Sequence, residues 1–276
     1  MIKTTTIAAG AVLALAAATA TPAAAQDWQG PYVGGYLGYG FQPDDDDERI
    51  LFDTDLDGQF GDTVRTGAGA DAFSPGFCGG RATGPTPADG CDDDDDGAEF
   101  GLRAGYDWQM GSWVVGAVGE IGRPDITDSV SGFSTTPARY TFTREVENIA
   151  ALRGRIGYDA GRFLPYVTAG FASAEVEGTY STSNGANSFT PMSVSDRRSG
   201  YQLGAGVETW VTSNMTVGVE YLYTNLEDDD YIVRTGPGTA PATNPFLLVD
   251  PTGTDQRRSD GDFDFHAVRV TAAWRF

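Results

Sequence analysis

The chain has 276 residues, with 18 basic and 39 acidic side chains, a formal net charge of −21, one histidine and two cysteines. Binding of nucleic acid requires a basic face, so the charge excludes a nucleic-acid partner. One histidine and two cysteines also leave little material for histidine catalysis or a thiolate metal cage. Beyond residue 25 no stretch approaches the roughly 18 consecutive apolar residues of a membrane helix. A membrane β-barrel is not excluded, because the sequence signal of each of its strands is much weaker than that of a membrane helix.

The first 25 residues have the three parts of a secretory signal peptide. Lys3 gives a positive start, residues 7–18 form an apolar run, and Ala23 to Ala25 are the small residues that signal peptidase cuts after. We expect a signal peptide over residues 1–25, cleavage before Gln26, and one domain over residues 26–276.

Eight segments alternate apolar and polar residues with period two, which predicts half-buried strands. They lie at residues 31–41, 98–109, 112–122, 145–159, 162–177, 200–211, 215–226 and 263–276. The connections alternate between long (42–97, 123–144, 178–199, 227–262) and short (110–111, 160–161, 212–214). Bacterial outer-membrane barrels have this rhythm of short periplasmic turns and long extracellular loops. The predicted fold is all-β, an eight-stranded antiparallel up-and-down transmembrane β-barrel with both termini in the periplasm.

Charged residues decide which face of each strand points inward. An arginine that faces lipid near the bilayer midplane costs about 2–4 kcal/mol. In every strand that carries such charges, the charged residues can be placed on the inward face by assigning one set of alternate residues to the interior. The inward set is then Arg103, Glu120, Arg153, Arg155, Glu208, Glu220, Arg269 and Arg275.

The expected interior of such a barrel is just wide enough for side chains to fill. Unpaired ions there would be strongly destabilising, so we expect paired Arg–Glu networks that plug the lumen. A gated thread of water, which makes a narrow channel for ions or small solutes, is the alternative.

Aromatic residues gather near the predicted periplasmic strand ends, where girdles anchor barrels at the membrane interface. They are Trp28, Tyr32, Trp108, Trp113, Trp210 and Trp274.

Several strands resemble the opacity-type and OmpA-like eight-stranded porin family, in particular its α-proteobacterial surface-antigen branch. The matching segments are Pro31 to Gly40, Leu152 to Tyr158, Arg162 to Gly170, Gly204 to Glu208 and Val219 to Tyr223. The final Trp274-Arg275-Phe276 resembles the family's assembly signal, which implies the barrel assembly machinery as a partner during biogenesis, with Trp274 and Phe276 as the signal residues. The resemblance implies an outer-membrane protein that serves envelope integrity or surface interaction and has no catalytic residues.

The first long connection, residues 42–97, is unusually acidic. It holds sixteen acids against three arginines, a net charge of −13, with like-charge runs at Asp44 to Asp47 and Asp92 to Asp96. Such runs predict a solvated, partly disordered surface segment.

Within this loop, Asp53, Asp55 and Asp57 precede Gly58, as in the first half of a calcium loop. Val64 stands where a bidentate Glu is required, and Asp62 substitutes for it only in a shorter loop. The hypothesis is weak Ca²⁺ binding by Asp53, Asp55, Asp57 and Asp62, at the millimolar level of extracellular modules. Divalent ions would relieve repulsion from the surrounding lipopolysaccharide.

Cys78 and Cys91 lie in the same loop. Export to an oxidising compartment favours a disulfide between them over a metal site. The single His266 falls on the outward parity, and no Gly-x-Ser-x-Gly elbow accompanies it.

Three function classes remain. The sequence favours a structural or surface-interaction protein without a cofactor other than Ca²⁺, with outer-membrane lipids and lipopolysaccharide as partners. A narrow channel is the first alternative, and a lipid A-modifying enzyme is the second.

Overall fold

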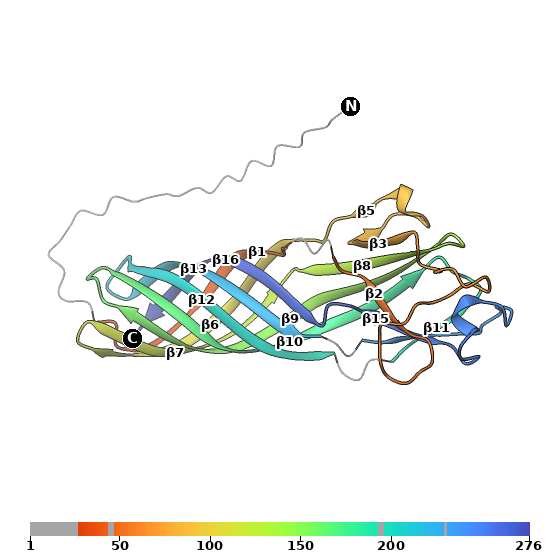
Figure 1. Ribbon diagram of the computed structural model, residues 1–276. Coiled ribbons are helices and arrows are strands. Elements are labelled where there is room, and N and C mark those ends of the chain that lie inside the picture. The colour runs from red at the N-terminus through yellow and green to blue at the C-terminus, as the bar shows by residue number, and fades with distance from the viewer. Residues whose placement is uncertain (1–26, 44–46, 193–195, 229–230) are drawn as a thin grey trace, which may run out of the picture.

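The computed structural model describes residues 27–43, 47–192, 196–228 and 231–276, so the expected signal peptide lies outside the described residues (Figure 1). Eight antiparallel strands hydrogen-bond in the order β10-β12-β13-β16-β1-β6-β7-β9, and β9 pairs with β10 to close a barrel. The barrel strands are β1 (Gly30–Phe41), β6 (Gly97–Met110), β7 (Trp113–Pro124), β9 (Ala138–Tyr158), β10 (Phe163–Thr182), β12 (Arg197–Trp210), β13 (Met215–Glu227) and β16 (Asp262–Arg275). The predicted all-β fold, an eight-stranded antiparallel barrel, is confirmed.

Short turns join β6 to β7, β9 to β10 and β12 to β13 at the end of the barrel that also holds the C-terminus (Figure 1). Gly111 and Gly161 stand in the first two turns with φ of 65° and 80°, a conformation that glycine adopts without a steric penalty. No helix in the described ranges is long and apolar enough to cross a bilayer. The assigned helices there are the single 3-10 turns η1 (Pro87–Asp89) and η2 (Pro245–Leu247).

Strands β9 and β10 extend well beyond their predicted bounds toward the long connections. The predicted loop over residues 123–144 is wrong. That range holds β8 (Thr127–Ser134) and the first part of β9. A β-bulge explains the error: Val146 and Asn148 pair with Val176 and Glu175, and Glu147 between them is skipped. Even-numbered residues of β9 face inward before the bulge, and odd-numbered residues face inward after it. The alternating pattern of apolar and polar residues is therefore interrupted at the bulge.

The predicted faces are otherwise as expected. Outward residues such as Leu102, Ile121, Leu152 and Val270 are exposed along the barrel wall, whereas the eight predicted inward charges are buried. The predicted aromatic girdle is correct for the exposed Trp108, Trp113 and Trp274.

Three members of the predicted girdle, Trp28, Tyr32 and Trp210, are instead buried. The rings of Trp28 and Trp210 lie 5.0 Å apart between centroids, and with Val114 and Leu164 they form an apolar cluster. Nearness to a strand end does not determine which face a side chain takes. Tyr32 of β1 and Trp210 of β12 stand at inward positions of their strands, and Trp28 precedes β1. The indoles close the short-turn end of the lumen.

The long connections fold into a cap over the opposite end (Figure 1). Its strands, in addition to β8, are β2 (Ile50–Asp53), β3 (Gly76–Gly79), β4 (Arg81–Ala82), β5 (Cys91–Asp92), β11 (Ser188–Pro191), β14 (Val233–Gly236) and β15 (Thr254–Arg258). A four-stranded sheet has the order β11-β14-β15-β2 and thus joins the first, third and fourth long connections.

The cap has an apolar core of its own. Its buried members are Ile50, Phe52, Val64, Ala72, Phe73, Val130, Ala138, Tyr140, Phe142, Val233 and Phe246. The expectation of a partly disordered first loop is therefore wrong for residues 47–96, because apolar side chains scattered among the acids are buried here. Residues 44–46 of the first acidic run lie outside the described residues.

Tyrosine rings inside the barrel pack over glycines of neighbouring strands. Tyr36 crosses the inner faces of Gly101 and Gly122, where a Cβ atom would lie 2.5 Å and 2.0 Å from its hydroxyl oxygen. Glycine at these positions therefore makes room for the ring in a narrow interior.

We expect Gly122→Ala to lower the free energy of unfolding by about 1–3 kcal/mol, because overpacking displaces the Tyr36 ring. Urea unfolding of the refolded protein measures the change. The control is Gly154→Ala on the outer wall, where a Cβ meets nothing closer than 3.9 Å. Equal stability of the two variants would contradict the packing argument, and Tyr36→Phe should reduce the cost of Gly122→Ala.

Candidate functional site

Four charged side chains form a closed ring inside the barrel near the short-turn end. Asp107, Arg155, Glu208 and Arg275 come from β6, β9, β12 and β16, which are alternate strands around the barrel. Each is at most 4 % exposed. Arg155 and Arg275 both contact Asp107, and they lie 2.6 Å and 3.6 Å from carboxylate oxygens of Glu208. The ring has no net charge and crosses the lumen.

The Tyr32 ring lies against this charge ring. The guanidinium carbons of Arg155 and Arg275 are each 4.9 Å from its centroid, so both cations face its π-electrons.

A second cluster lies farther toward the cap and contains three arginines and three glutamates. Its members are Glu99, Arg103, Glu120, Arg153, Glu220 and Arg269. Arg153 lies 2.6 Å from Glu120 and 3.1 Å from Glu220, and Arg269 lies 3.1 Å from Glu120 and contacts Glu99. Strands β9 and β13 are not neighbours, so the Arg153–Glu220 pair also crosses the lumen.

The structure places all eight predicted inward charges in these two groups and adds Glu99 and Asp107. Both added acids share the parity of Arg103 on β6, so the parity argument was sufficient to find them. With them, five arginines face five carboxylates, whereas the predicted set held five cations and three anions. The balance satisfies the requirement that buried ions be paired.

A third ionic cluster, which the sequence did not predict, lies where the barrel meets the cap. Arg258 of β15 lies 2.6 Å from both Glu48 and Asp128, and Arg144 of β9 lies 2.6 Å from Asp128 and 3.5 Å from Asp228. Arg144 faces inward only because of the bulge at Glu147, which is why uniform parity missed it. These pairs connect the first loop to β8, β9, β15 and Asp228, the residue that follows β13.

The electrostatics of this junction follow from burial and pairing. Burial alone would raise the pKa of Asp128, but Arg258 and Arg144 outweigh it and hold the pKa below its usual value. Burial raises the pKa of Glu48 despite Arg258. Burial, followed by the nearby Asp128 charge, raises the pKa of Asp94 to about 7, although its carboxylate accepts a 2.7 Å hydrogen bond from the Ser129 amide. Asp94 therefore belongs to the junction rather than to a uniformly solvated acidic run.

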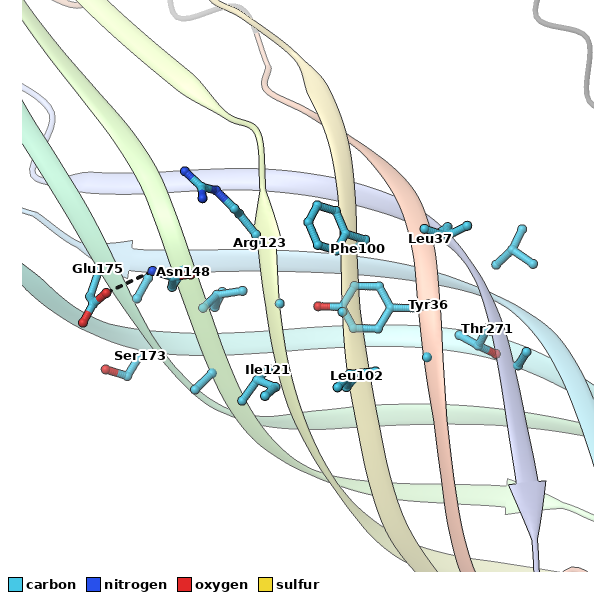
Figure 2. A pocket seen from close by; sticks show the side chains of 18 of the residues that line it. Tyr36, Leu37, Phe100, Leu102, Ile121, Arg123, Asn148, Ser173, Glu175 and Thr271 are labelled. Carbon is cyan, nitrogen blue, oxygen red and sulfur yellow. Dashed lines mark hydrogen bonds between the residues drawn. The ribbon is translucent and has the colours of Figure 1, made fainter.

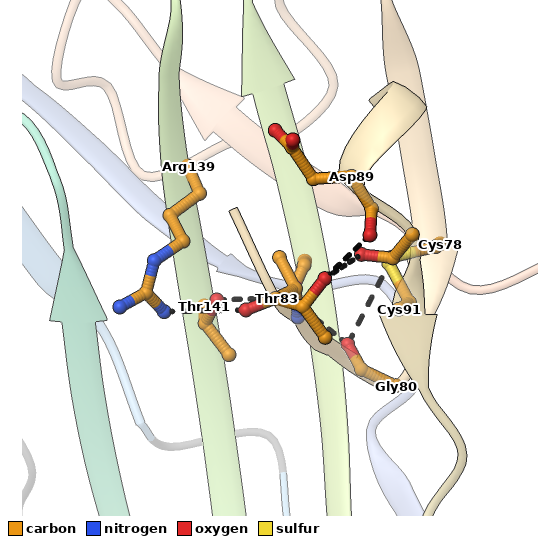
Figure 3. The surroundings of a disulfide bond; sticks show 10 residues. Cys78, Gly80, Thr83, Asp89, Cys91, Arg139 and Thr141 are labelled. Carbon is orange, nitrogen blue, oxygen red and sulfur yellow. Dashed lines mark hydrogen bonds between the residues drawn. A yellow bond between two sulfur atoms is a disulfide. The ribbon is translucent and has the colours of Figure 1, made fainter. Parts of the chain in front are cut away.

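The predicted disulfide between Cys78 and Cys91 is confirmed (Figure 3). Cys78 lies on β3, which pairs with β8, and Cys91 lies on β5, which pairs with β4. The Ser131 hydroxyl of β8 donates to the Gly80 carbonyl oxygen at 2.9 Å. The disulfide thereby joins the two ends of the segment from β3 to β5, which lies against β8 within the cap.

The predicted calcium ligands are brought together in part. Carboxylate oxygens of Asp53, Asp55 and Asp62 all lie within 4.8 Å of one another. Asp57 instead accepts a 2.8 Å hydrogen bond from the Gln59 amide, after a turn in which Leu56 has φ of 61°. Partial desolvation and then the Asp57 charge raise the pKa of Asp55.

The remaining predicted residues lie on the outer wall. Trp274 on the outward face of β16 and Phe276 directly after that strand are both exposed. His266 faces the same side, with Nδ1 2.6 Å from the Tyr221 hydroxyl and its ring stacked on Phe41. It lies in an aromatic surface, away from the ionic clusters.

We expect Arg155→Leu to lower the free energy of unfolding by about 3–5 kcal/mol, because it removes a partner from two buried carboxylates. Urea unfolding in lipid vesicles measures the effect. Arg81→Leu, an exposed cap arginine, is the control and should change it by less than about 0.5 kcal/mol. A small effect at Arg155 would show that the ring is hydrated and not tightly paired.

Comparisons with known proteins agree with this architecture. A family model described as "Outer membrane protein beta-barrel domain" matches residues 10–276. The 31 kDa outer-membrane immunogenic protein of Brucella melitensis is 27 % identical over 282 residues, which cover 100 % of this chain and 95 % of that protein. A 22 kDa outer membrane protein of Rhizobium leguminosarum is 36 % identical over 132 residues, 48 % of this chain and 54 % of the relative.

Among solved structures, OprG from Pseudomonas aeruginosa aligns with 12 % identity and a TM-score of 0.49, covering 90 % of this chain and 97 % of that one. The family model extends over nearly the whole chain. The chain therefore belongs to the outer membrane protein β-barrel domain family and is an outer-membrane protein.

Proposed function

We propose that this protein is a closed outer-membrane barrel with a structural and surface-interaction role, and that it is neither an open channel nor an enzyme. In this proposal the short turns and both termini face the periplasm, and the cap is presented outside the cell. The acidic first loop then lies on the outer face, where an extracellular partner meets it.

The observation that carries the proposal is the neutral ring of Asp107, Arg155, Glu208 and Arg275. Side chains from alternate strands meet across the lumen, and the apolar cluster of Trp28 and Trp210 lies beside them. Water or an ion passing through must break charge-assisted hydrogen bonds between buried groups. The interior thus favours a plug over a channel.

Two further features support the proposal of an outer-membrane protein with a surface role. The cap has its own apolar core and disulfide, so it presents a defined surface. The exposed Trp274 and Phe276 at the end of β16 are available on the outer wall, as an assembly signal read by the barrel insertion machinery requires.

Planar-bilayer recordings of the refolded protein test the closed barrel. We expect no conductance steps above the lipid baseline for the wild type. The double variant Arg155→Ala with Glu208→Ala keeps the interior neutral and removes two crossing side chains. The tryptophan cluster and the second ionic cluster still cross the lumen, so this variant should stay at the baseline as well. Wild-type steps whose size changes in Glu208→Ala would instead establish the channel.

A second candidate property is weak Ca²⁺ binding by the first loop, which the convergence of Asp53, Asp55 and Asp62 favours. Three carboxylates offer hard oxygen ligands but lack the bidentate Glu of a high-affinity loop. We propose a millimolar site that moderates repulsion from anionic lipopolysaccharide.

Calorimetric titration with CaCl₂ tests this site. We expect binding heat for the wild type and for Asp93→Ala, an exposed acid of the same loop outside the cluster, and its loss in Asp55→Ala. Equal heats for the two variants would remove the site.

A further inference from the structure

The outer wall of the barrel carries a groove of about 1050 Å³ that runs across β16, β1, β6, β7, β9 and β10 to the first residue of β12. The pairing of neighbouring strands places the outward residues that line the groove in two rows, one on each side. Leu37, Phe100 and Arg123 are paired neighbours on one side, and Leu102 and Ile121 are paired neighbours on the other. Figure 2 shows these residues in two rows.

The floor of the groove is the backbone of the row between those sides. Tyr36, Gly101 and Gly122 are paired across this row, and the Tyr36 side chain points into the barrel and is buried. The side residues Leu37, Phe100, Leu102 and Ile121 are exposed. The groove therefore opens on the membrane-facing side and not into the lumen.

The two ends of the groove differ in chemistry. Val270, Ala272 and Leu37 make the end at β16 and β1 apolar. The other end is polar and runs from β7 to β12, lined by Arg123, Asn148, Glu175 and Arg197. Glu175 is already engaged, 3.4 Å from Arg197 and accepting a 3.1 Å hydrogen bond from the Asn148 amide.

Arg123 is exposed, and it makes no ion pair with an acid in the part of the chain that the structure describes. It stands next to the last residue of β7, at the cap end of the wall. A lipid-facing arginine costs about 0–1 kcal/mol near the interface but more at the midplane, so this position suits the level of the headgroups.

We propose that the groove binds an acyl chain of a phosphorylated outer-leaflet lipid, with the lipid phosphate paired to Arg123. Rows of outward side chains two residues apart are separated by roughly 7 Å, which admits an alkyl chain. A guanidinium matches a phosphate with two parallel hydrogen bonds. The inference rests on the outer-membrane location and not on whether the barrel is closed.

The source of the phosphate is the membrane and not free phosphate in solution. The first loop, with a net charge of −13, covers the solution side and repels soluble anions, whereas a lipid reaches Arg123 along the bilayer. A second groove of about 620 Å³ runs beside the first and shares Leu102 and Ile121, so it offers space for a neighbouring chain of the same lipid.

The test uses the refolded protein in detergent micelles, titrated with diphosphorylated lipid A and followed by native mass spectrometry. We expect Arg123→Gln to weaken retention at least tenfold. Arg162→Gln, an exposed arginine at the short-turn end, should leave it unchanged. Ala150→Phe fills the groove from its exposed side without changing charge and should weaken binding as well.

Two results with phosphorylated lipid A would overturn the proposal. One is retention by Arg123→Gln within twofold of the wild type while the variant keeps the gel mobility of the folded barrel. The other is displacement of lipid A by millimolar inorganic phosphate, which would reveal a site for soluble anions. Dephosphorylated lipid A should bind the wild type and Arg123→Gln equally, and a difference between them would contradict the phosphate pairing.

Discussion

The structure depends on one constraint: a charge inside a narrow barrel must meet an opposite charge within that barrel. An eight-stranded lumen is filled by side chains, so bulk water is not available to solvate an arginine there. Five arginines and five carboxylates satisfy the constraint in two groups, and each group is neutral by itself. The ion pairs therefore determine both which face of each strand turns inward and whether the lumen is open.

The inward residues of β9 pass through successive apolar and ionic layers along the barrel axis. From the cap downward its inward residues are Tyr140 and Phe142 in the cap core, Arg144 in the junction, then Val146 and Ile149 in an apolar layer. Arg153 and Arg155 follow in the two barrel groups. Apolar and ionic layers thus alternate within one strand. The cap is a continuation of the barrel, and the junction pairs join connections that are distant in sequence.

Much of the barrel was predictable because lipid makes period-two patterns strict. A single misplaced arginine costs kilocalories, so parity identified the inward face of Arg103, Arg153 and Arg269 without a structure. The predictions failed where that strictness ends. The bulge at Glu147 changes the parity of β9, and this change concealed Arg144 and the junction cluster. Trp28 and Trp210 were assigned to the girdle because position along a strand was considered without its face.

The cap was the least predictable part, for a different reason. Its core collects Ile50 and Phe73 from the first connection, Tyr140 from the second and Phe246 from the fourth. No local pattern in any one connection indicates which others it meets. The acidic runs dominate the composition of the first loop and conceal the few apolar residues that fold it. The disulfide was predictable because two cysteines in an exported chain leave one pairing.

The central claim is that the interior arginines are paired and dry, and their own protons report on it most directly. Arg155 donates from Nε to Asp107 at 2.8 Å, and Arg269 donates from Nε to Glu99. Proton–nitrogen NMR spectra of the refolded protein in micelles, recorded after transfer to D₂O, follow both Nε–H signals. The account predicts that both persist long after the signal of the exposed Arg123 has vanished, whereas loss of all three at the same rate would contradict it.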